Sequence, residues 1–183
     1  MHIMPGYASN EKYEVHQNVT LNDETIKFFL RRVVLHQPYI KNWDYDPADI
    51  LTQGSRCVDS GLSLGAFDND KMVAIALAEV YDWNGTLWIP YFGVAAAHRR
   101  QGIGIQLMDN LAAHAQSQHL RVMVAETQTT NMPAIRFYRK AGFTFDAIDL
   151  SYYTNRDIAE GEVAIFMKRK LDQSPTLADR HAR

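Results

Sequence analysis

The chain has 183 residues, 46% of them hydrophobic and 22% charged, so it holds enough apolar material for a core and lacks the composition of a disordered protein. Its 19 basic and 21 acidic residues give a net charge of −2, which excludes a global basic field for binding nucleic acid. A single cysteine excludes an intramolecular disulfide framework and a multi-cysteine zinc site, and no apolar run is long enough to span a membrane.

This arithmetic predicts one domain over residues 13–171, with flexible tails at 1–12 and 172–183, in a reducing, cytoplasmic compartment. A short strand-like stretch, 12–19, opens the domain. Residues 20–36 then place apolar side chains at helical spacing behind the capping candidates Thr20 and Asn22, which predicts an amphipathic helix. The apolar positions are Ile26, Phe29, Leu30, Val33 and Val34.

Residues 41–61 have turn chemistry, and Pro47 favours one short helix after it. The same segment carries Asp44, Asp46 and Asp49. These acids either form a solvated loop or raise the local concentration of a cationic substrate.

From residue 62 the pattern becomes regular. Three strand-like runs within 63–95 are separated by turns and predict antiparallel strands. Helix, strand, helix and two further strand-like runs follow at 103–118, 120–128, 132–141, 143–154 and 162–171. The strand–helix–strand order implies one parallel crossover, so we expect an α/β protein of the α+β type. Its mostly antiparallel mixed sheet would have about six to seven strands, with about four helices.

A glycine turn joins the third of these strands to the next helix. The strand ends at Val94, His98 to Arg100 are basic, and Gly102 and Gly104 open the helix. Glycines let main-chain amides approach an anion closely, and the first turn of a helix adds the positive end of its dipole. Leu107 stands where a dinucleotide fingerprint needs a third glycine, and the Gly-Lys-Ser/Thr of a Walker loop is absent. A local phosphate site remains as the prediction.

The run from Arg99 to Gly104 resembles the acyl-CoA pyrophosphate loop of the GNAT superfamily of N-acetyltransferases. The resemblance implies the GNAT fold and acetyl-CoA as co-substrate. No metal is expected, because the seven histidines show neither an H-E-x-x-H nor a cysteine partner pattern. The resemblance also implies that the main chain of Phe92 and Val94 holds the pantetheine arm and the thioester. The pyrophosphate would be held by Arg99, Arg100, Gln101, Gly102, Ile103 and Gly104.

In the helix at 132–141, Asn131 is a natural N-cap and Tyr138 lies two turns further along the same face. The segment resembles the second GNAT signature, with Gly142 and Phe143 in register. The resemblance implies that Asn131 binds the CoA arm and that Tyr138 lies near the sulfur, where a phenol can act as general acid. The alternative is that Tyr138 only packs in the core.

The stretches 126–128 and 149–153 extend the resemblance to the streptothricin acetyltransferase branch. This implies a small cationic amine as acceptor, a streptothricin-like antibiotic among them. The net charge and the lack of a long apolar run predict neither a nucleic acid nor a membrane partner. A polyamine, an aminoglycoside-like drug or a protein amine stays open as acceptor, as does a homodimer. The alternative to an enzyme is a non-catalytic module that binds acyl-CoA without transferring the acyl group.

A general base must deprotonate the amine before it attacks. Glu79 and Glu126 lie near the ends of the two strands expected to flank the strand that ends at Val94, and strand alternation decides which one faces the thioester. We rank Glu126 first because it lies in the streptothricin-like segment 126–128, close to Asn131. A water relay would serve either carboxylate, and a structural role stays open for both.

Ser63 sits in a literal G-x-S-x-G, but a strand follows it where a nucleophile elbow needs a helix. Cys57 has no histidine nearby in sequence, which favours an inert thiol.

Overall fold

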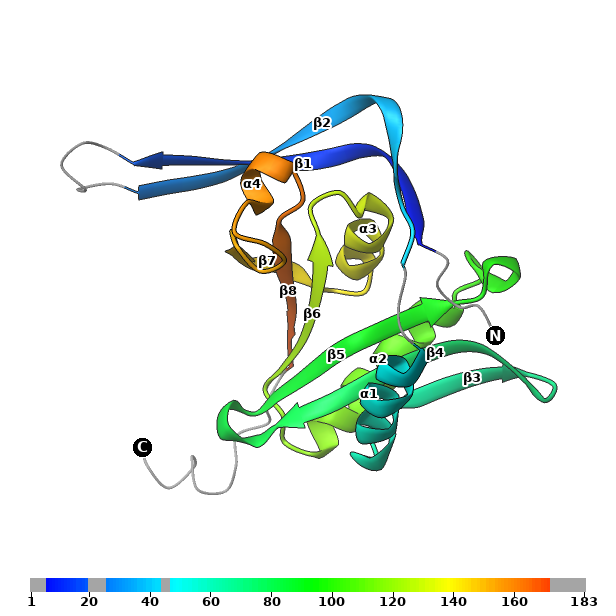
Figure 1. Cartoon of the computed structure of the whole chain (residues 1–183). Helices are drawn as coiled ribbons and strands as arrows, with labels where there is room; N and C mark the ends of the chain where they lie inside the picture. The colour runs from blue at the N-terminus through cyan, green and yellow to red at the C-terminus, as the bar shows by residue number, and fades with distance from the viewer. Residues whose placement is uncertain (1–5, 20–25, 44–46, 172–183) are drawn as a thin grey trace, which may run out of the picture.

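The computed structural model describes residues 6–19, 26–43 and 47–171. Within these ranges the chain forms eight strands and four α-helices (Figure 1). In chain order they are β1 Tyr7–Val19, β2 Ile26–Lys41, α1 Pro47–Asp59, β3 Leu64–Asp68, β4 Lys71–Tyr81, β5 Thr86–Val94, α2 Ile103–Ser117, β6 Val122–Gln128, α3 Met132–Lys140, β7 Thr144–Asp149, α4 Asp157–Glu160 and β8 Ala164–Lys170.

The main sheet of the described residues has six strands in the order β3-β4-β5-β6-β8-β7. Only β5 and β6 pair in parallel, with α2 as the crossover between them, and the other neighbours are antiparallel. This confirms the predicted mixed sheet with one parallel crossover. The strands β1 and β2 form a separate antiparallel hairpin beside α3 and α4 (Figure 1).

A bulge in β5 separates the two halves of the sheet. Trp88 lies opposite Glu79 and Tyr91 lies opposite Leu77, so two residues of β5 face one residue of β4 between these pairs. One of the two is Pro90, which has no N–H to give to a neighbouring strand. The parallel pairing of β5 with β6 stops one residue earlier, at Ile89, and the strands diverge from there (Figure 1).

Helices cover both faces of the β3–β5 half. α1 packs on β4, and α2 packs on β3, β4 and β5 behind them in the view of Figure 1. The core between α2, α3 and the sheet includes fully buried side chains from each layer, among them Leu87, Met108, Met123, Ile135 and Met167. This core fixes the β5–α2 turn against α3.

The expected helix at 20–36 is wrong: Ile26–Lys41 is the long strand β2. Its apolar spacing fits a helix, yet its content of Ile, Val, Phe and Tyr also favours a strand, and pairing with β1 decides the outcome. The supposed apolar stripe forms no buried face, since Val34 is 76% exposed and Phe29 is 50% exposed. The capping candidates Thr20 and Asn22 lie outside the described residues.

The start of the chain also differs from expectation. β1 begins at Tyr7, so the boundary placed at residue 13 is too late and residues 7–12 are not a tail. The predicted tail at 172–183 lies outside the described residues. The short helix expected after Pro47 is confirmed as α1. No helix in the described part of the chain has the length and apolar character needed to cross a membrane.

Candidate active site

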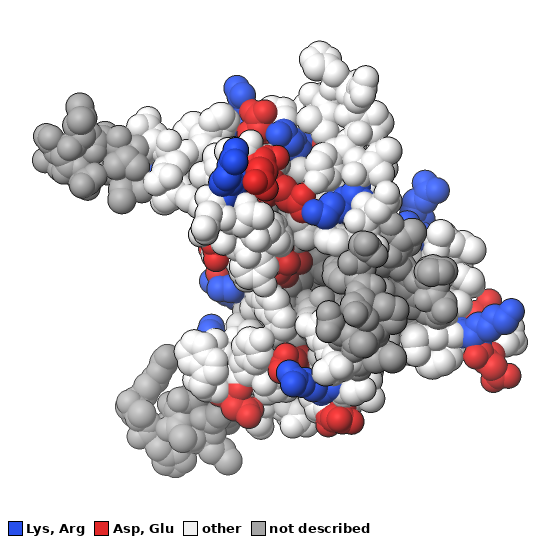
Figure 2. Space-filling view, viewed as in Figure 1, with Lys and Arg blue, Asp and Glu red and all other residues white. Residues whose placement is uncertain are grey.

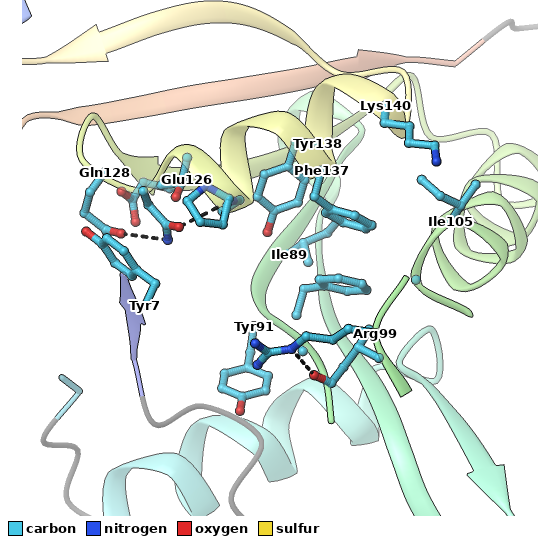
Figure 3. Close-up of a pocket in the computed structure, with 18 of the residues that line it drawn as sticks. Tyr7, Ile89, Tyr91, Arg99, Ile105, Glu126, Gln128, Phe137, Tyr138 and Lys140 are labelled. Atoms are coloured by element: carbon cyan, nitrogen blue, oxygen red, sulfur yellow. Dashed lines mark hydrogen bonds between the residues drawn. The ribbon is translucent and has the colours of Figure 1, made fainter. Parts of the chain in front are cut away.

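A cavity of about 810 Å³ lies where β5 and β6 diverge (Figure 3). Its walls come from β5, β6, the start of α2 and one face of α3, and residues 6, 7 and 43 beside the β1–β2 hairpin close one side. In the space-filling view, a notch at the left edge lies between the half that carries the hairpin and the β3–β5 half (Figure 2). The divergence of two strands therefore creates the site.

The main chain of β5 presents amides to this cavity. The N–H of Ala95 donates to the carbonyl of Val73 on β4 at 2.8 Å, and successive amides of a strand point alternately to its two edges. The amides of Phe92 and Val94 therefore point away from β4. Because β6 no longer pairs with β5 there, they face the cavity that both residues line.

The glycine turn is shaped by backbone and by space. Gly102 is the N-cap of α2 with a φ of 87°, in the left-handed region that favours glycine. A Cβ on Gly104 would lie 3.0 Å from the ring of Phe137 and 3.2 Å from the ring of Phe92. These two rings stack with their centroids 4.6 Å apart. The start of α2 thus lies directly against an aromatic wall of the cavity.

Positive side chains gather at this end of the cavity, where His98, Arg99, Arg100 and Lys140 line it. The Nε of Arg99 donates to the carbonyl of Val94 at 2.9 Å, which places the guanidinium beside the end of β5. His98 lies 3.2 Å from a carboxylate oxygen of Asp68. Four potential cations around a helix N-terminus suit a phosphate group.

Two members of the predicted loop set lie outside the cavity lining. The side-chain amide of Gln101 donates to the carbonyl of Ala97 at 3.0 Å, and Ile103 packs against the core. Their contribution to an anion would therefore come from main-chain amides rather than side chains.

Helix α3 brings Asn131 and Tyr138 to the cavity, as expected. The Asn131 side chain caps the helix by accepting the N–H of Ala134 at 3.2 Å and donates to Gln128 at 3.4 Å. Tyr138 is 7% exposed, and its hydroxyl is directed into the cavity (Figure 3). Burial, with a further contribution from the charge of Glu126, raises the pKa of Tyr138 well above its ordinary value of 10, so the phenol keeps its proton.

Glu126 lies across the cavity from the cationic end (Figure 3). Burial raises its pKa to about 7, although the hydrogen bond donated by the Tyr153 hydroxyl lowers it and the charge of Glu162 raises it slightly. A carboxylate with this pKa changes protonation near neutral pH, which is what a general base requires. The site therefore contains a protonated phenol and a titrating carboxylate close to each other.

The loop that carries Tyr153 is held by Asp157, which is 1% exposed. Its carboxylate accepts the amide of Tyr153 at 3.0 Å and the amide and hydroxyl of Thr154 at 2.7 and 2.8 Å. These bonds fix the loop whose phenol contacts Glu126.

The second carboxylate expected near the thioester lies elsewhere. Glu79 is on β4 opposite Trp88 and outside the lining of the cavity, near Cys57 and Tyr81. Asp44 and Asp46 lie outside the described residues, and the side chain of Asp49 is not among those described.

Two residues of the cavity lining, Lys140 and Tyr7, are not among the predicted site residues. Lys140 comes two residues after Tyr138, and the cations in the last turn of α3 were a signal for it. Tyr7 has no local signal, because the polar composition of residues 1–12, with Pro5 and Gly6, predicts a tail. Its hydroxyl is hydrogen-bonded to that of Thr130 at 2.6 Å, which joins β1 to the cavity wall.

Comparison with known proteins shows which protein family has this geometry. The model of the acetyltransferase (GNAT) family matches residues 19–143. The chain belongs to the GNAT acetyltransferase family. As a member it is an N-acetyltransferase enzyme, and the resemblance stated from the glycine turn and the Asn131–Tyr138 segment is confirmed.

The relatives of this GNAT acetyltransferase include streptothricin acetyltransferases and, over shorter stretches, acetyltransferases named for protein substrates. It is 32% identical over 161 residues to a streptothricin acetyltransferase of Escherichia coli, covering 87% of this chain and 83% of the relative. A nourseothricin acetyltransferase structure matches with a TM-score of 0.69 and 24% identity, over 93% of this chain and 89% of that one. A structure described as a putative streptothricin acetyltransferase of Bacillus anthracis, in complex with acetyl coenzyme A, has a TM-score of 0.69 and 19% identity, over 94% and 90%. These structures confirm the fold.

Proposed function

We propose that this enzyme transfers the acetyl group of acetyl-CoA directly to a primary amine of a small cationic molecule, with a streptothricin-like antibiotic as the acceptor. The observation that carries the proposal is the charge distribution in the cavity. A helix N-terminus with cationic side chains lies at one end, and the titrating carboxylate of Glu126 lies at the other. The first suits the phosphates of CoA, and the second suits an amine that must lose a proton. The streptothricin acetyltransferases among its relatives support the choice of acceptor.

Acetyl-CoA would bind along β5. Amides of the Gly102–Gly104 turn, together with Arg99 and Arg100, hold the pyrophosphate, and Asn131 contacts the CoA arm. The amides of Phe92 and Val94 bind the arm near the thioester, where one of them stabilises the oxygen that becomes negative when the amine attacks.

Glu126 takes a proton from the acceptor ammonium, either directly or through a water molecule, and the amine then forms a C–N bond at the thioester carbonyl. The bonded nitrogen loses its second proton to solvent, and the C–S bond breaks as the tetrahedral intermediate collapses to the amide. Tyr138 donates a hydrogen bond, and finally its proton, to the departing thiolate. Solvent then returns a proton to Tyr138 and removes one from Glu126.

The test is an acceptor panel with acetyl-CoA: a streptothricin, spermidine, an aminoglycoside and a peptide with an unblocked N-terminus. CoA thiol release and the mass of the acceptor are measured. We expect acetylation of a primary amine on the streptothricin, with kcat/KM higher than for the peptide. Acetylation of the peptide alone would overturn the small-molecule proposal, and tight acetyl-CoA binding without transfer to any acceptor would indicate a binding module.

A further inference from the structure

Five aromatic rings make a continuous strip on the face of the sheet that carries Glu126. Tyr81 stacks on Trp88 at a centroid distance of 6.5 Å, and Trp88 contacts Phe166 at 6.1 Å. Phe166 contacts Tyr152 at 5.5 Å, and Tyr152 contacts Tyr153 at 5.2 Å. Tyr81, Tyr152 and Tyr153 are 37%, 46% and 37% exposed, so the strip is open to solvent.

One end of the strip meets the reaction site and the other end meets a second carboxylate. Tyr153 donates to Glu126 at the first end. At the other end Glu79 lies directly opposite Trp88 and two residues before Tyr81, on the same face of β4. The two carboxylates are therefore joined by aromatic surface.

Glu79 is partly buried and, among the described residues, has no ion-pair partner. Glu162, by contrast, has an ion-pair partner: the ammonium of Lys41 lies 2.8 Å from its carboxylate. A partly buried carboxylate beside aromatic faces favours a cation, since both the charge and the ring quadrupole attract it.

Strand geometry gives the spacing between the two carboxylates. Glu79, Trp88 and Val124 lie side by side on β4, β5 and β6, and Glu126 is two residues beyond Val124. Two strand separations and a two-residue step put the α-carbons of Glu79 and Glu126 at least about 12 Å apart, since β6 diverges from β5 beyond Ala125. An extended chain of six to eight methylenes would span the space between the side chains.

We propose that Glu79, Tyr81 and Trp88 form a second cation subsite, so that the enzyme prefers acceptors with an ammonium or guanidinium group about 10 Å from the reacting amine. This rests on the proposed function, because Glu126 marks where the reacting amine lies. Glu79 thereby acts in recognition of the acceptor rather than as the base.

The test compares two probes that differ in one charge, octane-1,8-diamine and 8-aminooctan-1-ol. Each is titrated by calorimetry into the protein saturated with CoA. We expect the diamine to bind about tenfold more tightly than the amino alcohol, as one charge-assisted contact predicts. Glu79→Gln should remove this difference and leave the affinity for the amino alcohol unchanged. Asp70→Asn, at an exposed acid in the β3–β4 turn, should leave the affinities for both probes unchanged.

Acetyl-CoA affinity equal to that of the parent shows that Glu79→Gln is folded. If it is not folded, Tyr81→Ala, which changes an exposed ring, provides the second test with the same expected loss of discrimination. Equal binding of both probes to the parent, or no binding of either, overturns the subsite. Failure of the proposed function shows separately, as absence of acetyl transfer to every acceptor of the panel.

Discussion

At the scale of single residues, the site depends on how burial acts on two groups. The same loss of water that keeps Tyr138 protonated moves the titration of Glu126 to neutral pH. For the carboxylate, burial outweighs a hydrogen bond from Tyr153 that would otherwise favour the charged form. A phenol that holds its proton and a carboxylate that can accept one suit an acid and a base respectively.

The raised pKa of Glu126 predicts a dependence of stability on pH. Its folded pKa of about 7 exceeds the ordinary 4.5, so the folded state binds this proton more tightly than the unfolded state. The resulting stabilisation is full below pH 4.5 and is lost as pH rises through 7. Glu126→Gln should therefore be more stable than the parent at pH 8, by on the order of 2 kcal/mol, and similar to it at pH 4.5.

Denaturant unfolding of parent and variant at both pH values measures this difference. Asp70→Asn, which also removes one carboxylate but at an exposed position, is measured in parallel as the control. A Glu126→Gln protein that is less stable than the parent at pH 8 would show that the carboxylate is stabilised, rather than penalised, by its surroundings.

Tyr138→Phe tests the proposed acid. The ring contacts of Tyr138 with Phe92, Phe137 and Phe143 do not require the hydroxyl, so we expect the cavity to survive. We predict that kcat falls about 100-fold, since the thiolate loses its proton donor, with acetyl-CoA affinity within about twofold of the parent. Steady-state kinetics and calorimetry measure the two quantities. Tyr13→Phe, outside the cavity lining, is the control, and an unchanged kcat for Tyr138→Phe would remove the acid role.

At the scale of elements, a bulge and a turn set the geometry of the site. The bulge that contains Pro90 ends the pairing of β5 with β6, and it leaves the amides of Phe92 and Val94 facing the cavity. The β5–α2 turn then places a helix N-terminus at the end of the same strand. A ligand lying along β5 would meet donors over its whole length.

The turn gives a matched pair of variants. Gly102 and Gly61 have φ values of 87° and 77°, and a Cβ on either would meet no atom within 4 Å. Alanine at either position should cost about 1 kcal/mol of folding free energy through backbone strain alone. Only Gly102→Ala should also weaken acetyl-CoA binding, by about tenfold, because it disturbs the amides at the start of α2. Thermal unfolding and calorimetry measure both effects, and equal acetyl-CoA affinity of the two variants would contradict the assignment of the turn.

The elements also show what the sequence could predict. From β3 to β8, turn signals and a clear change of period mark every element except α4, and the family motifs lie at their ends. The helix α4 has four residues, too few to show a helical period. The apolar spacing from Ile26 to Val34 gave the wrong prediction of a helix, because this spacing fits both a helix and a strand. Only pairing with the distant strand β1 decides between them. Pro90 is a local signal of an irregular strand, but the place where β5 leaves β6 depends on contacts between distant segments. The arrival of Tyr7 at the cavity depends on such contacts too and has no local signal.

At the scale of the whole molecule, the net charge of −2 hides an ordered distribution within the cavity. Basic and acidic side chains are interspersed over the visible surface (Figure 2). Inside the cavity they separate, with His98, Arg99, Arg100 and Lys140 at one end and Glu126 at the other. The divergence of the two half-sheets holds these ends apart, so one cavity can bind an anionic donor and a cationic acceptor together.

The most direct test of this account is the pH dependence of kcat with saturating acetyl-CoA and a saturating amine that the panel identifies as acceptor. For the parent, kcat should rise about tenfold per pH unit and level off above an apparent pKa near 7, because Glu126 must be deprotonated to accept the amine proton. Glu126→Gln should have a kcat at least about 100-fold lower at pH 8 and no inflection near 7. An inflection of the same position and height in Glu126→Gln would contradict the assignment of Glu126 as the base.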